Sequence, residues 1–185
     1  MQLILEVYFD HIVIRGEEML FVTVGTHEQQ FNRLVEYMDH LARDGQIAEE
    51  VIIQTGFSTY IPRHCKWSKL FPYSEMQKYI QSARIVITHG GPSSFIAPLQ
   101  IGKIPIVVPR KKEFGEHVND HQVRFCRQVA GKNGNIIVVE SIDDLGGLIK
   151  NYEGFISGLP TEMKSNNLNF CNGLRDIVEE IMQEI

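Results

Sequence analysis

At residues 84–94 the sequence reads Arg84-Ile85-Val86-Ile87-Thr88-His89-Gly90-Gly91-Pro92-Ser93-Ser94. A short run of apolar, β-branched residues predicts a strand that is buried on both faces of a parallel sheet. The two glycines that follow predict a tight turn, and a serine just beyond them can cap the next helix. A strand, a glycine turn and a helix in this order are typical of an α/β protein.

The same alternation continues on both sides of this segment. Strands are expected at Phe21–Val24, Glu50–Gln54, Arg84–Thr88, Ile104–Val108 and Asn135–Val139. Helices are expected at Glu28–Arg43, Ser74–Ser82 with Ser74 as its cap, Ser93–Ile101, Asn119–Ala130 and Ile142–Tyr152. Strands and helices that alternate at this length imply right-handed βαβ units. The sequence therefore predicts an α/β fold, with a single Rossmann-like parallel sheet and helices on both faces.

The two ends of the chain differ from this central pattern. Residues 1–18 are expected to be an N-terminal extension outside the main fold, or alternatively an extra edge strand. Residues 19–156 form the predicted Rossmann-like domain. Residues 157–185 are expected to be a linker followed by an amphipathic C-terminal helix, Phe170–Ile185. This helix either packs on its own domain or docks on a partner protein.

Composition narrows the class of protein. With 43% hydrophobic residues and a net charge of −5, the chain resembles an ordinary globular domain and offers no electrostatic reason to bind nucleic acid. No apolar run reaches the roughly 20 residues that cross a bilayer, and the N-terminus lacks the basic start of a secretory signal. Cys65, Cys126 and Cys171 are widely spaced, which fits buried thiols in a reducing compartment.

Small and polar residues follow several predicted strands, where open parallel sheets bind ligands. Gly25, Thr26 and His27 form the first such turn, and small residues there let a ligand approach the backbone and the next helix N-terminus. The chain has neither GxGxxG nor a Gly-Lys-Ser/Thr loop. Any α/β domain needs such turns, so this one alone does not distinguish a site from a scaffold.

The turn at residues 88–94 is more specific. Its backbone amides and the hydroxyls of Ser93 and Ser94 are expected to converge where a diphosphate can bind. His89, at the end of the strand, can donate a hydrogen bond or a proton to a phosphate oxygen. A purely structural histidine is an equally good alternative.

A third cluster, residues 113–122, places many hydrogen-bonding side chains between a strand and a helix. Carboxylate, amide and imidazole groups of this kind recognise sugar hydroxyls; a solvated loop capped by Asn119 or Asp120 is the alternative. His117 and His121 stand four residues apart, but the HExxH order of zinc enzymes is absent. No metal site is expected.

Three segments together resemble the C-terminal, donor-binding domain of family 28-type GT-B glycosyltransferases. They are Thr88–Ser94, Gly102–Arg110 and Glu116–Gln122, and the match runs from about Met19 to Ala130. More narrowly, Phe21–Glu28 with Phe31-Asn32-Arg33-Leu34 is similar to catalytic subunits of bacterial two-component transferases for exopolysaccharide and capsule synthesis. These subunits are akin to the cytosolic subunit of the dolichol-linked GlcNAc transferase.

This resemblance implies that the chain is one half of a GT-B fold. A membrane-anchored, Rossmann-like partner supplies the other half and binds the lipid-linked saccharide acceptor. The expected location is therefore cytoplasmic, peripheral at the inner face of the plasma membrane through that partner. The implied donor is a UDP-sugar, with UDP-galactose favoured over UDP-GlcNAc and UDP-glucuronic acid, and no cofactor is expected.

The resemblance also assigns donor-binding residues. Gly25, Thr26 and His27 match the turn that meets the phosphates. His89, Gly90, Gly91, Ser93 and Ser94 match the segment on the diphosphate, and Asp120, His121 and Gln122, with Glu116, His117 and Asn119 beside them, match the segment that holds the sugar. Many relatives bind ribose with a glutamate where this chain has Phe95-Ile96-Ala97. Glu116 is the candidate replacement.

No DxD motif is present, so a metal-independent mechanism is expected. The resemblance implies that transfer proceeds with inversion. Helix N-terminal amides, His89 and Arg110 are the candidates to stabilise the charge of the leaving diphosphate. The general base lies in the partner or, within this chain, at His27. Two alternatives remain open: a nucleotide-sugar epimerase, which needs both halves in one chain, and a non-catalytic subunit that binds nucleotide-sugar and stimulates a transferase.

Overall fold

A computed structural model of the chain describes residues 19–159 and Arg175. The predicted extension at residues 1–18, most of the predicted linker and the C-terminal helix lie outside the described residues. Among the helices of the described part, none combines the length and apolar character needed to cross a bilayer.

Six parallel strands form one sheet in the order β3-β2-β1-β4-β5-β6. Their bounds are β1 (Met19–Thr23), β2 (Glu50–Gln54), β3 (Lys66–Ser68), β4 (Ile85–His89), β5 (Ile106–Val108) and β6 (Ile137–Val138). In register, Phe21 of β1 pairs with Ile52 of β2 on one side and Val86 of β4 on the other. The strand order reverses between β1 and β4, so ligands are expected at the carboxyl ends of these two strands.

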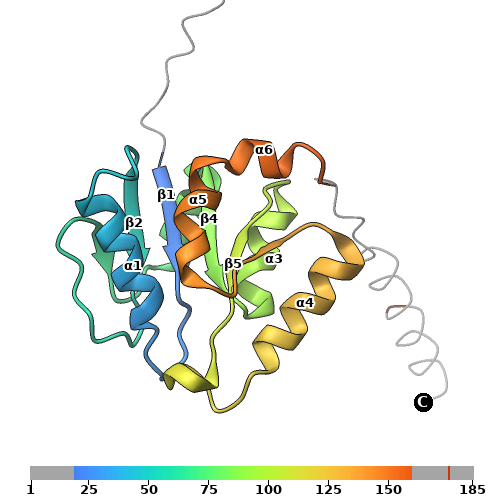
Figure 1. The fold of residues 1–185 in the computed structure, drawn as a ribbon, viewed down its shortest axis with the longest axis horizontal. Coiled ribbons are helices and arrows are strands. Elements are labelled where there is room, and N and C mark those ends of the chain that lie inside the picture. Colours follow the sequence, from blue (N-terminus) through green and yellow to red (C-terminus); the bar gives the residue numbers. More distant parts are fainter. Residues whose placement is uncertain (1–18, 160–174, 176–185) are drawn as a thin grey trace, which may run out of the picture.

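Helices cover both faces of the sheet (Figure 1). They are α1 (Asn32–Arg43), α2 (Tyr73–Ser82), α3 (Pro92–Gln100), α4 (His121–Asn133), α5 (Leu145–Lys150) and α6 (Tyr152–Ile156), with 3₁₀ turns η1 (Lys112–Phe114) and η2 (Ile142–Asp144). The predicted fold class, a single Rossmann-like parallel sheet with helices on both faces, is confirmed.

The alternation of side chains along β1 separates the core into layers. Leu20 and Val22 pack into the largest apolar cluster, which also contains Leu34 and Met38 of α1. Phe21 points to the opposite face and packs with Ile80 of α2. A third cluster joins α3 and α4 over β5. β1 is therefore buried on both faces of the sheet.

Several predicted boundaries are wrong, and each has a local cause. The first helix begins at Asn32 rather than near Glu28, because residues 24–31 form a loop tied to residues 58–60 through Asn32 and Ser58. Ser74 does not cap α2, which begins after Pro72. The predicted helix Ile142–Tyr152 is divided into η2, α5 and α6. The sequence prediction also missed β3, which has only three residues and two exposed side chains.

Candidate functional site

A cavity of about 530 Å³ opens at the carboxyl ends of β1 and β4. Part of its lining comes from the predicted residues Gly25, Thr26, His27, His89, Ser93 and Ser94. The structure therefore brings the first two predicted turns together, as the strand order requires. Apolar side chains from α2 and α3 line the opposite side: Met76, Ile80, Ile96 and Ala97.

His89 is enclosed by two of the predicted glycines. A Cβ atom at Gly25 would lie 2.4 Å from Nε2 of His89, and one at Gly91 would lie 2.2 Å from its Cε1. Gly25 also has a φ of +76°, which favours glycine. These glycines therefore make room for an imidazole ring, a requirement beyond the expected approach of a ligand to the backbone.

The environment of His89 keeps its ring neutral. Burial, and then the nearby charge of Arg110, lowers the pKa of His89 to about 4. The backbone N–H of Gly91 donates to Nδ1 at 3.0 Å, so the ring proton must lie on Nε2. Nε2 is 2.9 Å from Oγ of Ser94 and donates to it. The hydroxyl proton of Ser94 is then free to point to a ligand in the cavity, and His89 positions this donor.

Arg110 does not reach the cavity. Its side chain is fully buried, and its guanidinium donates to the carbonyl oxygens of Gln29, Gln30, Glu116 and Val24 at 2.8–3.1 Å. This corrects the expectation that Arg110 donates directly to the diphosphate. Burial lowers its pKa to about 10, so it remains a cation beneath the turn that carries His27.

Glu116 is also buried, which contradicts its expected role at the ribose. Its two carboxylate oxygens accept a bidentate pair from Arg33 of α1, each at 2.9 Å. Oε2 accepts a further bond from the backbone N–H of Lys111. With no side-chain surface exposed, Glu116 ties the loop after β5 to α1 rather than binding a ligand.

Gln122 and Asp120 have positioning contacts of the same kind. Oε1 of the buried Gln122 accepts from the backbone N–H groups of both Gly90 and Arg110 at 3.1 Å. This one amide oxygen thus joins the turns after β4 and β5. Asp120 precedes α4 without capping it, and its Oδ1 accepts from the backbone N–H of Lys112. Neither side chain lines the cavity.

His27, His117 and His121 form a row of imidazole rings beside the cavity. Ring centroids are 4.9 Å apart for His27 and His117, and 4.5 Å for His117 and His121. Burial, followed by the charges of neighbouring histidines and Arg110, lowers the pKa of His117. The row therefore joins the turn after β1 to the loop before α4.

Hydrogen bonds divide these histidines into donors and one acceptor. Nδ1 of His27 accepts from the backbone N–H of Gln29, so a neutral His27 carries its proton on Nε2. It therefore presents a donor, which does not suit the expected general base. At His121, Nδ1 lies 2.7 Å from Oδ1 of Asn119, an oxygen that the backbone N–H of His121 also contacts. Nδ1 must then donate, which leaves a lone pair on Nε2.

The sequence reasoning missed several residues that line the cavity. They are Thr23, Gln54, Tyr73, Gln77 and Gln100. Gln54 ends β2 and belongs to a strand-end group that the sequence makes visible. Gln77 and Gln100 lie on α2 and α3 with no motif to distinguish them. Both line the cavity together with Ala97.

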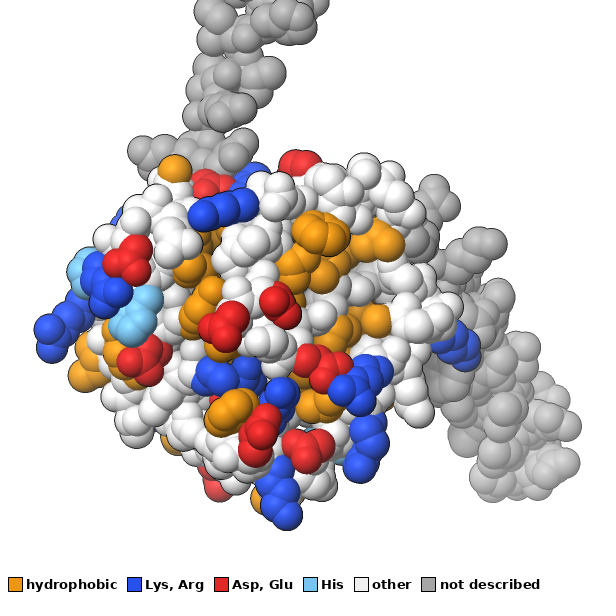
Figure 2. Space-filling view, in the orientation of Figure 1, with side chains coloured by type: hydrophobic (Ala, Val, Ile, Leu, Met, Phe, Trp, Pro, Cys, Tyr) orange, Lys and Arg blue, Asp and Glu red, His pale blue; other side chains and the backbone are white. Residues whose placement is uncertain are grey.

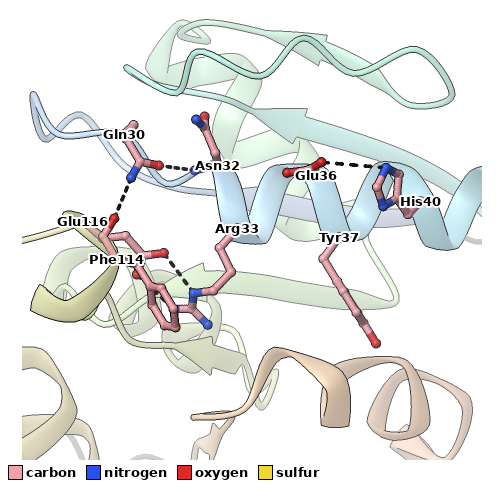
Figure 3. A pocket seen from close by; sticks show the side chains of 8 residues that line it. All are labelled: Gln30, Asn32, Arg33, Glu36, Tyr37, His40, Phe114 and Glu116. Carbon is pink, nitrogen blue, oxygen red and sulfur yellow. Dashed lines mark hydrogen bonds and ion pairs between the residues drawn. The ribbon is translucent and has the colours of Figure 1, made fainter.

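A second cavity, of about 480 Å³, lies along α1 and is shown in Figure 3. Arg33 points from the helix to Phe114 and Glu116, while Glu36 and His40 lie farther along the same helix. The guanidinium of Arg33 stacks over the ring of Phe114 at 4.9 Å. These contacts of Arg33 belong to the ion-paired joint between α1 and the loop after β5. In the described part of the chain, no three acidic, histidine or cysteine side chains are grouped to hold a metal.

Two solved glycosyltransferases share this fold. The glycotransferase of kitacinnamycin has a TM-score of 0.52 and 18% identity, over 73% of this chain and 34% of that protein. The spinosyn forosaminyltransferase has a TM-score of 0.52 and 13% identity, over 77% of this chain and 36% of that protein. This chain therefore spans about a third of the length of either protein.

A search of curated protein sequences found no match. A family profile did match: the glycosyltransferase family 28 C-terminal domain aligns with residues 19–180. That match covers the whole described sheet and most of the chain. The protein therefore belongs to the glycosyltransferase family 28 C-terminal domain family.

Proposed function

We propose that this chain is the donor-binding subunit of a glycosyltransferase that moves a hexose from a UDP-sugar to a lipid-linked saccharide. The expected setting is exopolysaccharide or capsule synthesis, together with a membrane-anchored Rossmann-like partner. The observation that carries the proposal is the cavity at the β1–β4 switch point, where the His89–Ser94 pair meets the start of α3. Family membership supports the chemistry, and the resemblance supports the donor and the partner.

The cavity offers suitable groups for a diphosphate. The hydroxyls of Thr26, Ser93 and Ser94, together with Nε2–H of His27, are neutral donors around one space. The N-terminus of α3 adds its partial positive charge to these donors. Such an arrangement stabilises the charge that grows on a leaving nucleoside diphosphate without a metal ion. The resemblance to family 28-type enzymes favours transfer with inversion.

The proton of the acceptor hydroxyl needs a base. His27 presents a donor, whereas Nε2 of His121 presents a lone pair held in place by Asn119. Within this chain we therefore favour His121 as the general base. The alternative is a base in the partner. His121 is the last residue in the row of histidines, and this place suits a base that meets an acceptor brought by the partner.

Binding of UDP to the purified chain tests the donor site directly. Calorimetry should show binding that weakens about tenfold or more in Ser94→Ala, since a charge-assisted hydrogen bond contributes about 1.5–3 kcal/mol. Ser82→Ala changes an exposed serine at the end of α2 and should bind as the unaltered chain does. Absence of UDP binding, or equal binding by both variants, would contradict the proposed site.

Transfer is tested with the partner present. A panel of UDP-galactose, UDP-GlcNAc and UDP-glucuronic acid, with a lipid-linked saccharide, should give product with one donor, and UDP-galactose is expected. If the chain binds UDP but His121→Asn and Ser94→Ala both leave transfer by the complex unchanged, the chain is a non-catalytic binding subunit instead.

A further inference from the structure

Exposed apolar side chains are concentrated around β3, at one edge of the sheet. Within residues 57–73 they are Phe57 (40% exposed), Ile61 (63%), Trp67 (44%), Leu70 (46%) and Tyr73 (76%). The strand β3 is the edge strand of the described sheet, and it pairs only with β2 among the described strands. We refer to these five residues with Arg63, Lys66 and Lys69 as the β3-edge surface.

The chain segment that forms this surface carries basic side chains and no acidic ones. Residues 51–74 contain Arg63, Lys66 and Lys69 but no aspartate or glutamate, although the whole protein has 23 acidic and 18 basic residues. The side chains of Arg63 and Lys69 are exposed, while Lys66 is paired with Glu50 of β2. By contrast, the face that carries α1 and α5 interleaves acidic and basic side chains (Figure 2).

Backbone hydrogen bonds bring the apolar and basic groups together. The N–H groups of Thr55 and Gly56 donate to the carbonyls of Ser68 and Lys69, each at 2.9 Å. These bonds place Phe57 beside the end of β3, where the ammonium of Lys69 lies 4.6 Å from the centre of its ring. The same end of the sheet holds the donor cavity, to which Tyr73 contributes. The surface therefore adjoins the mouth of the cavity.

We propose that the β3-edge surface binds the surface of an anionic lipid bilayer. Exposed tryptophan, tyrosine and leucine insert at the headgroup level of a membrane, and lysine and arginine attract its anionic lipids. A protein partner would need an acidic apolar face of its own, whereas a bilayer supplies both properties without shape complementarity. This contact is separate from anchoring through a partner, and it sets the mouth of the donor cavity next to a lipid-linked substrate.

Trp67 is the only tryptophan of the protein, so its fluorescence reports on this surface alone. The full chain is mixed with vesicles of equal phosphatidylglycerol and phosphatidylcholine, or of phosphatidylcholine only. With the anionic vesicles, the emission should move to shorter wavelength and Trp67 should become protected from iodide. No change, or the same change with neutral vesicles, would overturn the proposal.

Charge reversal tests the basic part of the surface. Arg63→Glu with Lys69→Glu should raise the dissociation constant for anionic vesicles by about tenfold or more, since each basic residue near the surface contributes about 1 kcal/mol. Arg124→Glu with Lys132→Glu makes the same change in net charge at exposed positions of α4 and should have a smaller effect. Equal effects of the two double variants would overturn a localised contact.

A matched pair of variants tests the apolar part of the surface. Leu70→Ser should weaken vesicle binding, whereas Phe155→Ser, at a similarly exposed residue of α6, should not. UDP binding serves as the independent control for folding and for the donor site, and it should be unchanged in all four variants. If vesicles leave Trp67 accessible but a membrane partner shields it, the surface is a protein interface and the lipid proposal is wrong.

Discussion

The neutral state of His89 makes the stability of the protein depend on pH. Its pKa is lowered to about 4 in the folded chain, against 6.5 for an ordinary histidine. Between these values the unfolded chain binds more protons, so the free energy of unfolding should fall as pH drops from 6.5 to 4. The difference corresponds to at most about 3 kcal/mol, at 1.36 kcal/mol for each pH unit.

Urea unfolding at pH 4.5 and pH 7.5 checks this prediction. In His89→Gln the loss of stability between the two pH values should be smaller than in the unaltered chain, because the variant has no imidazole to protonate there. An equal loss in both proteins would show that His89 is not held neutral by burial. Absolute stability is also expected to fall in the variant, so only the difference between the two pH values is diagnostic.

The glycines around the site give a second prediction at this scale. Gly91→Ala places a Cβ atom against the ring of His89, whereas Gly131→Ala in α4 meets no atom within 4 Å. The first change should destabilise the protein by about 1–3 kcal/mol through overpacking and should weaken UDP binding. The second should stabilise it by about 0.5–1 kcal/mol, because alanine favours a helix over glycine. Thermal unfolding and UDP titration distinguish these outcomes.

Sequence reasoning at the residue scale predicted which residues lie together better than it predicted their contacts. Residues that follow parallel strands must meet at one edge, so Thr26, His89 and Ser94 were predictable as neighbours. The burial of Arg110 and Glu116 was not, because it depends on Phe31, Arg33 and the loop carbonyls of another segment. In a sequence, a charged residue of a polar loop looks like a ligand-binding residue in both cases, whether its side chain faces a cavity or is buried beneath one.

At the scale of elements, the joint between α1 and the loop after β5 determines how rigidly the site is held. Arg33→Met would leave the buried carboxylate of Glu116 without its ion-pair partner. Removing one partner of such a pair typically costs about 3–5 kcal/mol. Arg43, on the same helix, forms an exposed pair with Asp44, and solvent screens such a pair so that it adds little to stability. Arg43→Met is therefore the matched control.

Chemical denaturation of the two variants measures this contrast, and UDP binding extends it. Arg33 does not line the donor cavity, so weaker UDP binding by Arg33→Met would show that the joint positions the turn after β1. Similar stability of the two variants would mean that the pair of Arg33 and Glu116 is solvated in solution.

Helices and strands were predictable where the pattern of hydrophobic residues and the length of the element agreed. The long apolar runs of β1 and β4 and the amphipathic α1 were recognised, because periodicity reports burial. The three-residue β3 was missed since Lys66 and Trp67 are exposed and only its pairing with β2 makes it a strand. Helix starts were misplaced where a capping serine was assumed, as at Ser93 and Ser94, although α3 begins at Pro92 without a side-chain cap.

For the whole molecule, we propose that the donor cavity is one half of the active site. The chain spans 34% and 36% of two glycosyltransferases of the same fold, and the cavity opens at a single edge of its sheet. We propose that a second protein domain, placed across this edge, supplies the acceptor site.

The purified chain alone should therefore bind UDP yet transfer no sugar to a lipid-linked saccharide, whereas the chain with its membrane partner should do both. Proximity and orientation of the two substrates account for this difference, because alignment alone can contribute about 7–11 kcal/mol to a bimolecular step. Radiolabelled product from UDP-galactose, measured with each subunit and with the pair, checks the prediction, and Ser94→Ala in the pair tests whether the donor enters through this chain. Full transfer by the chain alone would show that its own carboxyl edge already contains the acceptor site.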